Sequence, residues 1–214
     1  LGSKVNSLQK EVMKLKVELA MNESIKKENE ELSRLLKIKD TYAEYTIIPA
    51  KILSFSLTDP NRITVYFDKS DKNRISRDST VVSSMGLVGK IISFMENSAD
   101  VELITSTSFS LPVVLESQNE CTGIAKGNGQ SMTIKFIDRN CASYSLESKK
   151  FLSANFSKNS TIPYIPVGVV KISEEDPENV LFLKAEAEPL FKKGKLNHLF
   201  IISGEGFTNE KVPF

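Results

Sequence analysis

The single histidine of this chain, His198, is the side chain best suited to move protons near neutral pH. An acyl-transfer triad needs a serine nucleophile, a histidine base and a carboxylate, with donors for the oxyanion. His198 lies near the C-terminal end, between Leu and Phe residues, and the following run from Ser203 to Gly206 lacks the flanking pattern of a nucleophile. We therefore expect no catalysis and interpret His198 as a partly buried strand residue.

Two cysteines, Cys121 and Cys141, lie 20 residues apart, without the further Cys or His residues that a zinc site needs. A disulfide between them would stabilise the fold by about 3 kcal/mol in an oxidising compartment. A hairpin centred on Gly127–Gly129 would place Cys121 opposite a residue near Phe136, and Cys141 falls beyond that register. We therefore expect two independent thiols and keep the disulfide as the alternative.

An acidic run, Glu174, Glu175 and Asp176, precedes Pro177 and Asn179 in a pattern typical of a solvated hairpin turn. Without further ligands these carboxylates make a poor calcium site. We expect neither a metal nor a cofactor.

Charge is balanced along the chain, with 28 basic and 27 acidic residues and no Trp. Such a chain has no net field to attract nucleic acid or an anionic membrane. Nucleic-acid binding is therefore not expected.

The N-terminal segment, residues 4–40, is predicted to be a coiled-coil helix. From Val5 to Leu19 the apolar residues step by three and four, which is the spacing of a coiled-coil seam. Continuing the register puts Asn22, Lys26 and Asn29 inward, while the next apolar residues follow a displaced frame that would overwind a supercoil. The predicted seam, which we expect to form a parallel dimer, consists of Leu8, Val12, Leu15, Leu19, Ile25, Leu32 and Leu36.

The alternative is a helix that packs along its own globular domain. Residues 4–39 would form a helix about 54 Å long, which is more than a head of this size needs for cover. We therefore favour self-association.

The first three residues, Leu1, Gly2 and Ser3, resemble the scar left by protease cleavage. No run of this sequence approaches the 18 apolar residues of a membrane span. Because the predicted coiled coil starts directly at this boundary, we expect the natural chain to begin earlier, with a membrane anchor.

After the helix, the chain has the pattern of short β-strands throughout. The runs are rich in Val, Ile and Phe and are bounded by Gly, Pro, Asn, Asp or Ser, as in barrels or a sandwich. The expected strands are 47–55, 62–68, 80–83, 87–94, 101–104, 111–115, 121–126, 132–137, 167–172 and 180–187. Residues 140–161 are predicted to be an exposed connection with one short strand at 148–152.

Several motifs follow one another in an order that resembles the family of the rod shape-determining protein MreC. They are VVSSMGLVGKI at 81–91, IIPAKIL at 47–53, VYFDKS at 65–70, IPVGVV at 165–170 and KAEAEPLFKKGKLNHLFII at 184–202. The resemblance covers nearly the whole chain. It departs from the family pattern at Ser70 and at Ser153, Ala154 and Asn155, where local turn geometry is affected.

The resemblance implies a mainly β head of two small six-stranded β-barrels behind the coiled coil. We expect residues 45–85 with 162–204 to form the first barrel, residues 86–161 the second, and residues 205–214 a tail. In such proteins the head lies on the periplasmic face of the cytoplasmic membrane, held by a single-pass anchor.

The function implied is that of a non-enzymatic scaffold for cell elongation. Family members are described as linking MreB filaments and MreD to a penicillin-binding transpeptidase and a RodA-type glycosyltransferase. Two alternatives remain: a periplasmic adaptor of an export system, which needs a returning second helix, and a protease, because the barrels resemble those of chymotrypsin-like enzymes.

Candidate partner surfaces are strand edges and two Gly-containing segments. Gly86 and Gly89 also suit a tight turn with no binding role. The candidate residues are Gly86, Leu87, Val88, Gly89, Tyr164, Pro166, Val167 and Gly168.

Overall fold

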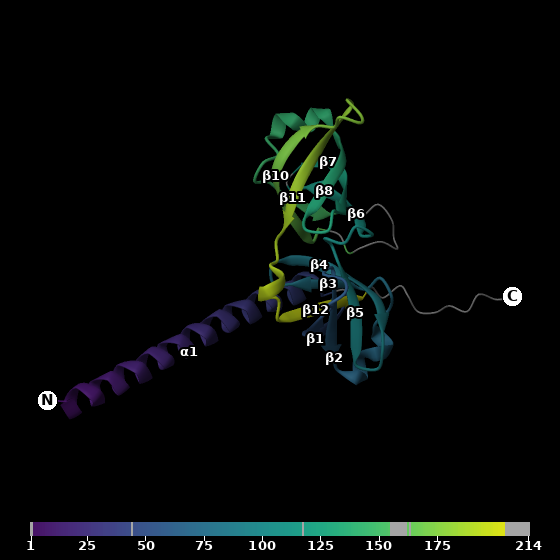
Figure 1. Ribbon diagram of the computed structural model, residues 1–214. Helices are drawn as coiled ribbons and strands as arrows, with labels where there is room; N and C mark the ends of the chain where they lie inside the picture. Colours follow the sequence, from purple (N-terminus) through teal and green to yellow (C-terminus); the bar gives the residue numbers. More distant parts are fainter. Residues whose placement is uncertain (1, 44, 117, 155–161, 163, 204–214) are drawn as a thin grey trace.

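The computed structural model describes all residues except 1, 44, 117, 155–161, 163 and 204–214. The described part has one long helix, α1 (Gly2–Thr41), and two closed six-stranded β-barrels. Most of α1 projects away from the barrels (Figure 1). The predicted fold class is confirmed, and the predicted tail lies outside the described residues.

The first barrel, barrel 1, combines strands from both ends of the chain. Its strands are paired in the order β1-β12-β3-β4-β5-β2. Side chains alternate along β2, so that Ile63, Val65 and Phe67 point into the core of barrel 1 and Tyr66 points outward. The strands are β1 (Thr46–Phe55), β2 (Arg62–Phe67), β3 (Thr80–Ser83), β4 (Gly86–Phe94), β5 (Ser98–Leu103) and β12 (His198–Ser203).

The second barrel, barrel 2, is continuous in sequence and has the order β10-β11-β8-β7-β6-β9. The short strand expected near residues 148–152 is β9. The strands are β6 (Ser110–Leu115), β7 (Gln118–Gly127), β8 (Met132–Asp138), β9 (Lys150–Ser153), β10 (Pro166–Glu175) and β11 (Phe182–Pro189).

The predicted boundaries between the barrels are wrong, although barrel 1 is split as expected. Strands β4 and β5 close barrel 1 rather than starting barrel 2, and β10 and β11 belong to barrel 2. The reason is local pairing: β3, β4 and β5 form consecutive antiparallel neighbours, so the chain leaves barrel 1 only after Leu103. Among the described strands that follow barrel 2, β12 returns to barrel 1.

The two barrels repeat one topology. Replacing β1, β12, β3, β4, β5 and β2 by β7, β6, β9, β10, β11 and β8 converts one closed order into the other. Each barrel has a short 3-10 helix at the same place, η1 (Lys69–Arg74) and η2 (Arg139–Tyr144), and each is capped by an Asp side chain.

Backbone detail supports this repeat. Asp78 has a positive φ of 67° and donates its N–H to the carbonyl of Ile91 at 2.8 Å. Ser148 has a φ of 65° and donates to the carbonyl of Val170 at 2.9 Å. Equivalent turns, each with a positive-φ residue that donates to the second strand that follows it in sequence, β4 or β10, indicate that both barrels are versions of one structural unit.

Cys121 and Cys141 form a disulfide, so the expectation of two independent thiols is wrong. Their Cα atoms lie 5.8 Å apart, and both residues are buried. Hairpin register alone would carry Cys141 past Cys121. Instead, β8 ends at Asp138, and η2 turns the chain so that Cys141 points back into barrel 2.

Candidate partner-binding surfaces

His198 begins β12 and contacts α1 rather than a nucleophile. Its Nε2 lies 3.2 Å from Oε1 of Glu28, and its side chain is 14% exposed. The prediction of a partly buried strand residue is confirmed. Among the residues that the structure describes, no three or more His, Cys, Asp or Glu side chains gather as metal ligands would.

The acidic run near residue 175 forms part of the β10–β11 hairpin. Glu174 and Glu175 are exposed, as expected of a solvated turn, but Asp176 is buried. The Oδ1 atom of Asp176 accepts a hydrogen bond from the backbone N–H of Glu178 at 3.0 Å. This carboxylate therefore stabilises the turn.

The predicted seam is exposed along the whole of α1. Its seven side chains are between 41% and 61% exposed within the single chain: Leu8, Val12, Leu15, Leu19, Ile25, Leu32 and Leu36. An apolar row of this length has a large hydrophobic cost in water. The row is therefore a candidate binding surface. Within the described residues, no helix is both long and apolar enough to cross a membrane.

The C-terminal part of α1, from Glu28 onward, contacts the head. Leu35 is buried to 3% exposure, and Ile38 and Tyr42 pack against the core with partial burial. Burial raises the pKa of the Tyr42 hydroxyl, and the neighbouring Tyr45 adds to this. The alternative of a helix lying along its own domain thus holds for the C-terminal part of α1 and not for the exposed N-terminal part.

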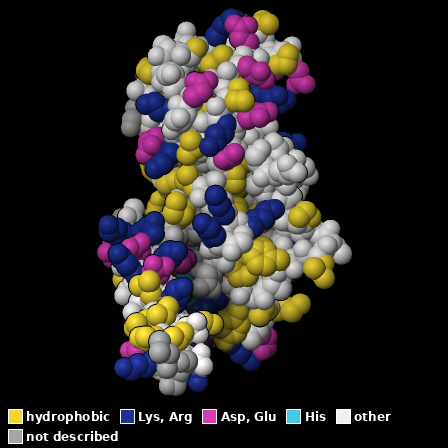
Figure 2. Space-filling view, turned by 60° about the vertical axis from the view of Figure 1, so that its left-hand side comes forward, with side chains coloured by type: hydrophobic (Ala, Val, Ile, Leu, Met, Phe, Trp, Pro, Cys, Tyr) yellow, Lys and Arg dark blue, Asp and Glu magenta, His cyan; other side chains and the backbone are white. Residues whose placement is uncertain are grey.

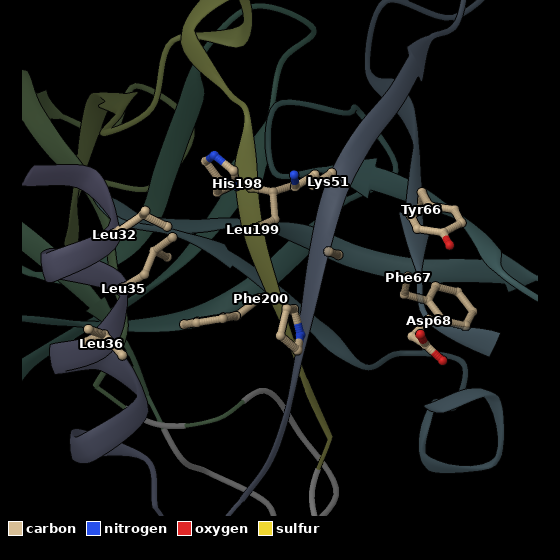
Figure 3. Close-up of a pocket in the computed structure, with 12 residues that line it drawn as sticks. Leu32, Leu35, Leu36, Lys51, Tyr66, Phe67, Asp68, His198, Leu199 and Phe200 are labelled. Carbon is tan, nitrogen blue, oxygen red and sulfur yellow. The ribbon is translucent and has the colours of Figure 1, made fainter. Parts of the chain in front are cut away.

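A groove of about 460 Å³ lies between α1 and barrel 1. Figure 3 shows helix residues on one side, β12 and β1 between, and Tyr66 with Phe67 on the other side. The groove was not predicted from the sequence, because its lining residues come from four separate segments, 32–36, 49–51, 66–68 and 198–200. It is lined by Leu32, Leu35, Leu36, Pro49, Ala50, Lys51, Tyr66, Phe67, Asp68, His198, Leu199 and Phe200.

The segment from Gly86 to Gly89 cannot be a partner surface because it is buried. Leu87 and Val88 are 1% and 0% exposed. A Cβ at Gly89 would overlap the carbonyl oxygen of Glu102 on β5. Glycine is needed at position 89 because β4 and β5 approach each other closely there. This agrees with the alternative that these glycines have a structural role and do not bind a partner.

The segment from Tyr164 to Gly168 is partly exposed and partly buried. Tyr164 is 60% exposed with a positive φ of 62°, whereas Val167 and Gly168 are buried in barrel 2. Pro166 lies against β4 of barrel 1, because a Cβ at Gly86 would overlap its carbonyl oxygen. The two segments therefore meet where the barrels join, and of the named residues only Tyr164 offers an exposed side chain.

Polar contacts complete this junction between the barrels. The Nδ2 atom of Asn61 donates to the carbonyl of Gly129 at 3.0 Å. Its Oδ1 accepts from the Thr105 hydroxyl at 2.6 Å and from Nζ of Lys193 at 3.1 Å. Burial lowers the pKa of Lys193, although the carboxylate of Asp59 opposes this. The network fixes one barrel against the other.

Strand edges are not available as binding surfaces, because both sheets close on themselves. The exposed apolar residues of the head lie instead in loops and on outward strand positions. Figure 2 shows them in separate groups, with Lys, Arg, Asp and Glu interspersed. Those above 45% exposure are Leu53, Phe55, Leu57, Tyr66, Met85, Met95, Phe136, Tyr164, Ile172, Val180 and Leu181. An exposed apolar residue of this kind could have been predicted from the sequence where it lies at the tip of a hairpin, as Leu181 does.

Comparison with known proteins agrees with this architecture. The sequence model of the family "Rod shape-determining protein MreC, barrel core" matches residues 55–203. The cell shape-determining protein MreC of Listeria monocytogenes is 31% identical over 137 residues, 62% of this chain and 46% of that protein. MreC of Haemophilus influenzae is 26% identical over 205 residues, 96% of this chain and 57% of that protein. This chain spans about half the length of these relatives.

Two solved structures share the fold. MreC from Pseudomonas aeruginosa superposes with a TM-score of 0.63 at 20% identity, covering 73% of this chain and 98% of that one. A chain from the complex between penicillin-binding protein PBP2 and MreC of Helicobacter pylori gives 0.57 at 18% identity, covering 75% and 99%. The family match extends over most of the chain, and includes all of barrel 2 and the strands of barrel 1 from β2 onward. The chain therefore belongs to the family of the rod shape-determining protein MreC.

Proposed function

We propose that this chain is a non-enzymatic scaffold of the cell-elongation machinery that pairs through α1 and presents its barrels to a peptidoglycan synthase. The observation that carries the proposal is the exposed apolar seam on a helix that projects from a two-barrel head. A helix with such a row gains stability by burying it against another helix.

A penicillin-binding transpeptidase is the partner that we propose for the head. The Helicobacter pylori complex joins a chain of this fold to PBP2. MreD, MreB and a RodA-type glycosyltransferase are further partners that the family suggests for the full-length protein.

We place the barrels outside the cytoplasm, on the periplasmic face of the inner membrane, held by an N-terminal anchor. The buried Cys121–Cys141 disulfide supports this, because structural disulfides persist in oxidising compartments.

Sedimentation equilibrium tests the pairing. Leu15→Glu/Leu19→Glu should be monomeric at micromolar concentration with folded barrels, because charges replace two seam residues. The matched control is Met13→Glu/Val17→Glu, which removes equally exposed apolar residues outside the seam and should remain dimeric. A seam variant that stays dimeric would refute pairing through the seam.

A pull-down with the extracytoplasmic part of a penicillin-binding transpeptidase tests the partner. The wild-type chain should be retained by the transpeptidase. The monomeric seam variant should be retained more weakly, because a dimer presents two heads to the immobilised partner. No retention by either protein would refute the proposed partner. An adaptor, by contrast, requires a second antiparallel helix, and the described residues contain one long helix.

A further inference from the structure

We propose that Asn128 is a site of intramolecular deamidation and that the junction between the barrels restrains the reaction. Asn128 and Gly129 form the one Asn-Gly pair of the sequence. Glycine at the second position leaves its backbone nitrogen without a side chain that would hinder attack on the neighbouring amide. The inference goes beyond the proposed scaffold function and does not depend on pairing through α1.

The reaction requires this residue pair and water. The backbone nitrogen of Gly129 gives its proton to solvent and bonds to Cγ of Asn128, while the bond between Cγ and Nδ2 breaks and ammonia leaves. Water then adds to one of the two carbonyl carbons of the resulting succinimide ring, which opens to aspartate or isoaspartate. Ring closure is favoured because the nucleophile and the amide belong to adjacent residues.

The β7–β8 turn activates the amide of Asn128. Its Oδ1 accepts hydrogen bonds from the backbone N–H of Gln130 at 3.1 Å and of Ser131 at 2.8 Å. These donors would stabilise the negative charge that develops on Oδ1 when Cγ is attacked. Nδ2, the leaving nitrogen, contacts Oγ of Ser131 at 2.9 Å. Asn128 is also exposed, so water reaches the amide in the folded protein.

The nucleophile, in contrast, is held by the other barrel and the segment that leads from it. The N–H of Gly129 donates to the carbonyl of Thr105, between β5 and β6, at 2.8 Å. The carbonyl of Gly129 accepts from Nδ2 of Asn61 at 3.0 Å. While these bonds persist, the peptide groups on both sides of Gly129 are fixed and its nitrogen keeps its proton. Attack on Asn128 therefore requires the junction to open.

The junction is packed too closely for the turn to move within it. A Cβ at Gly127 would overlap the backbone of Thr105 and Ser106, so the turn lies directly against this segment. Nζ of Lys193 donates to Oδ1 of Asn61 at 3.1 Å and keeps the amide of Asn61 oriented toward the turn. The rate of deamidation should therefore follow the population of molecules in which the junction is open.

The modification would in turn weaken the junction. Isoaspartate adds one carbon atom to the main chain directly before Gly129, which displaces the N–H from Thr105 and the carbonyl from Asn61. Because two coupled equilibria affect each other equally, an open junction promotes ring closure and isoaspartate favours the open junction. Deamidation would thus convert a transient opening between the barrels into a permanent one.

Peptide mapping by mass spectrometry tests the site in the intact chain, incubated at mildly alkaline pH. Asn61→Ala should deamidate at Asn128 about tenfold faster than the wild type, because loss of a buried hydrogen bond populates the open junction. Lys193→Met should also accelerate the reaction. The matched control is Thr64→Ala, which removes a hydroxyl that donates to Asp100 within barrel 1 at 2.9 Å and should change the rate less than about twofold.

Each outcome bears on the proposal. Equal rates in the wild type, Asn61→Ala and Lys193→Met would overturn the restraint, as would equal acceleration by Thr64→Ala, which would indicate global unfolding. A wild-type chain that is not modified at Asn128 even when unfolded in urea would overturn the site. The isoaspartate form, separated by ion exchange, should show faster amide hydrogen exchange at Gly129, and unchanged exchange would overturn the effect on the junction.

Discussion

The side-chain amide of Asn61, in barrel 1, donates a hydrogen bond of 3.0 Å to the carbonyl of Gly129, in the β7–β8 turn of barrel 2. These residues are 68 positions apart in sequence, and the contact joins the barrels directly. Because Oδ1 of Asn61 also accepts from Thr105 and Lys193, one amide holds three elements together.

Asn61→Ala should lower the free energy of unfolding by about 2 kcal/mol, because it leaves buried polar partners unsatisfied. It should also accelerate amide hydrogen exchange of Gly129, whose N–H donates to the carbonyl of Thr105. Asn128→Ala is the control: its side chain caps the same turn from within barrel 2. Equal exchange rates in the Asn61 variant and the wild type would contradict the joining role of Asn61.

Lys193 should make stability depend on pH at the alkaline end. Burial lowers its pKa below the ordinary value of 10.5, so the unfolded chain binds more protons between the two values. The contribution of Lys193 to the free energy of unfolding therefore rises with pH between its folded and unfolded pKa values. That contribution is lowest below the folded pKa. Urea unfolding of the wild type and Lys193→Met should show the wild type gaining stability relative to the variant as pH rises toward 10.5. The opposite slope would refute a lowered pKa.

Gly89→Ala should destabilise barrel 1 by about 2 kcal/mol or more, since its Cβ would overlap the carbonyl of Glu102. Gly194→Ala is the matched control, because nothing lies within 4 Å of a Cβ there. We expect it to change stability by less than about 0.5 kcal/mol. Thermal unfolding measures both. Similar losses in the two variants would contradict a specific requirement for close strand approach at Gly89.

Reduction of the Cys121–Cys141 disulfide should cost about 3 kcal/mol of stability. Urea unfolding with and without dithiothreitol measures this loss. The double variant Cys121→Ala/Cys141→Ala should be insensitive to the reductant. A wild-type chain whose unfolding does not respond to reductant would contradict the disulfide.

The sequence by itself determined the elements of this protein, because they depend on local periodicity. The three-and-four spacing from Val5 to Leu19 predicted α1, and alternation with Gly, Asn and Pro boundaries located the strands. The order of motifs was sufficient to suggest the family. In contrast, the sequence did not show that Leu35 is buried and Leu36 exposed. Two adjacent leucines on a helix differ in burial only because barrel 1 covers one of them.

Only the tertiary structure decided how these elements combine. Closure of each barrel joins strands distant in sequence, so it assigned β12 to barrel 1 and buried the segment containing Leu87. The turn at η2 places Cys141 next to Cys121, a contact that the register of the predicted hairpin did not indicate. The groove beside Tyr66 exists because α1, β1, β2 and β12 meet in space. Contacts between remote segments depend on closure and packing, which leave no periodic signal in the chain.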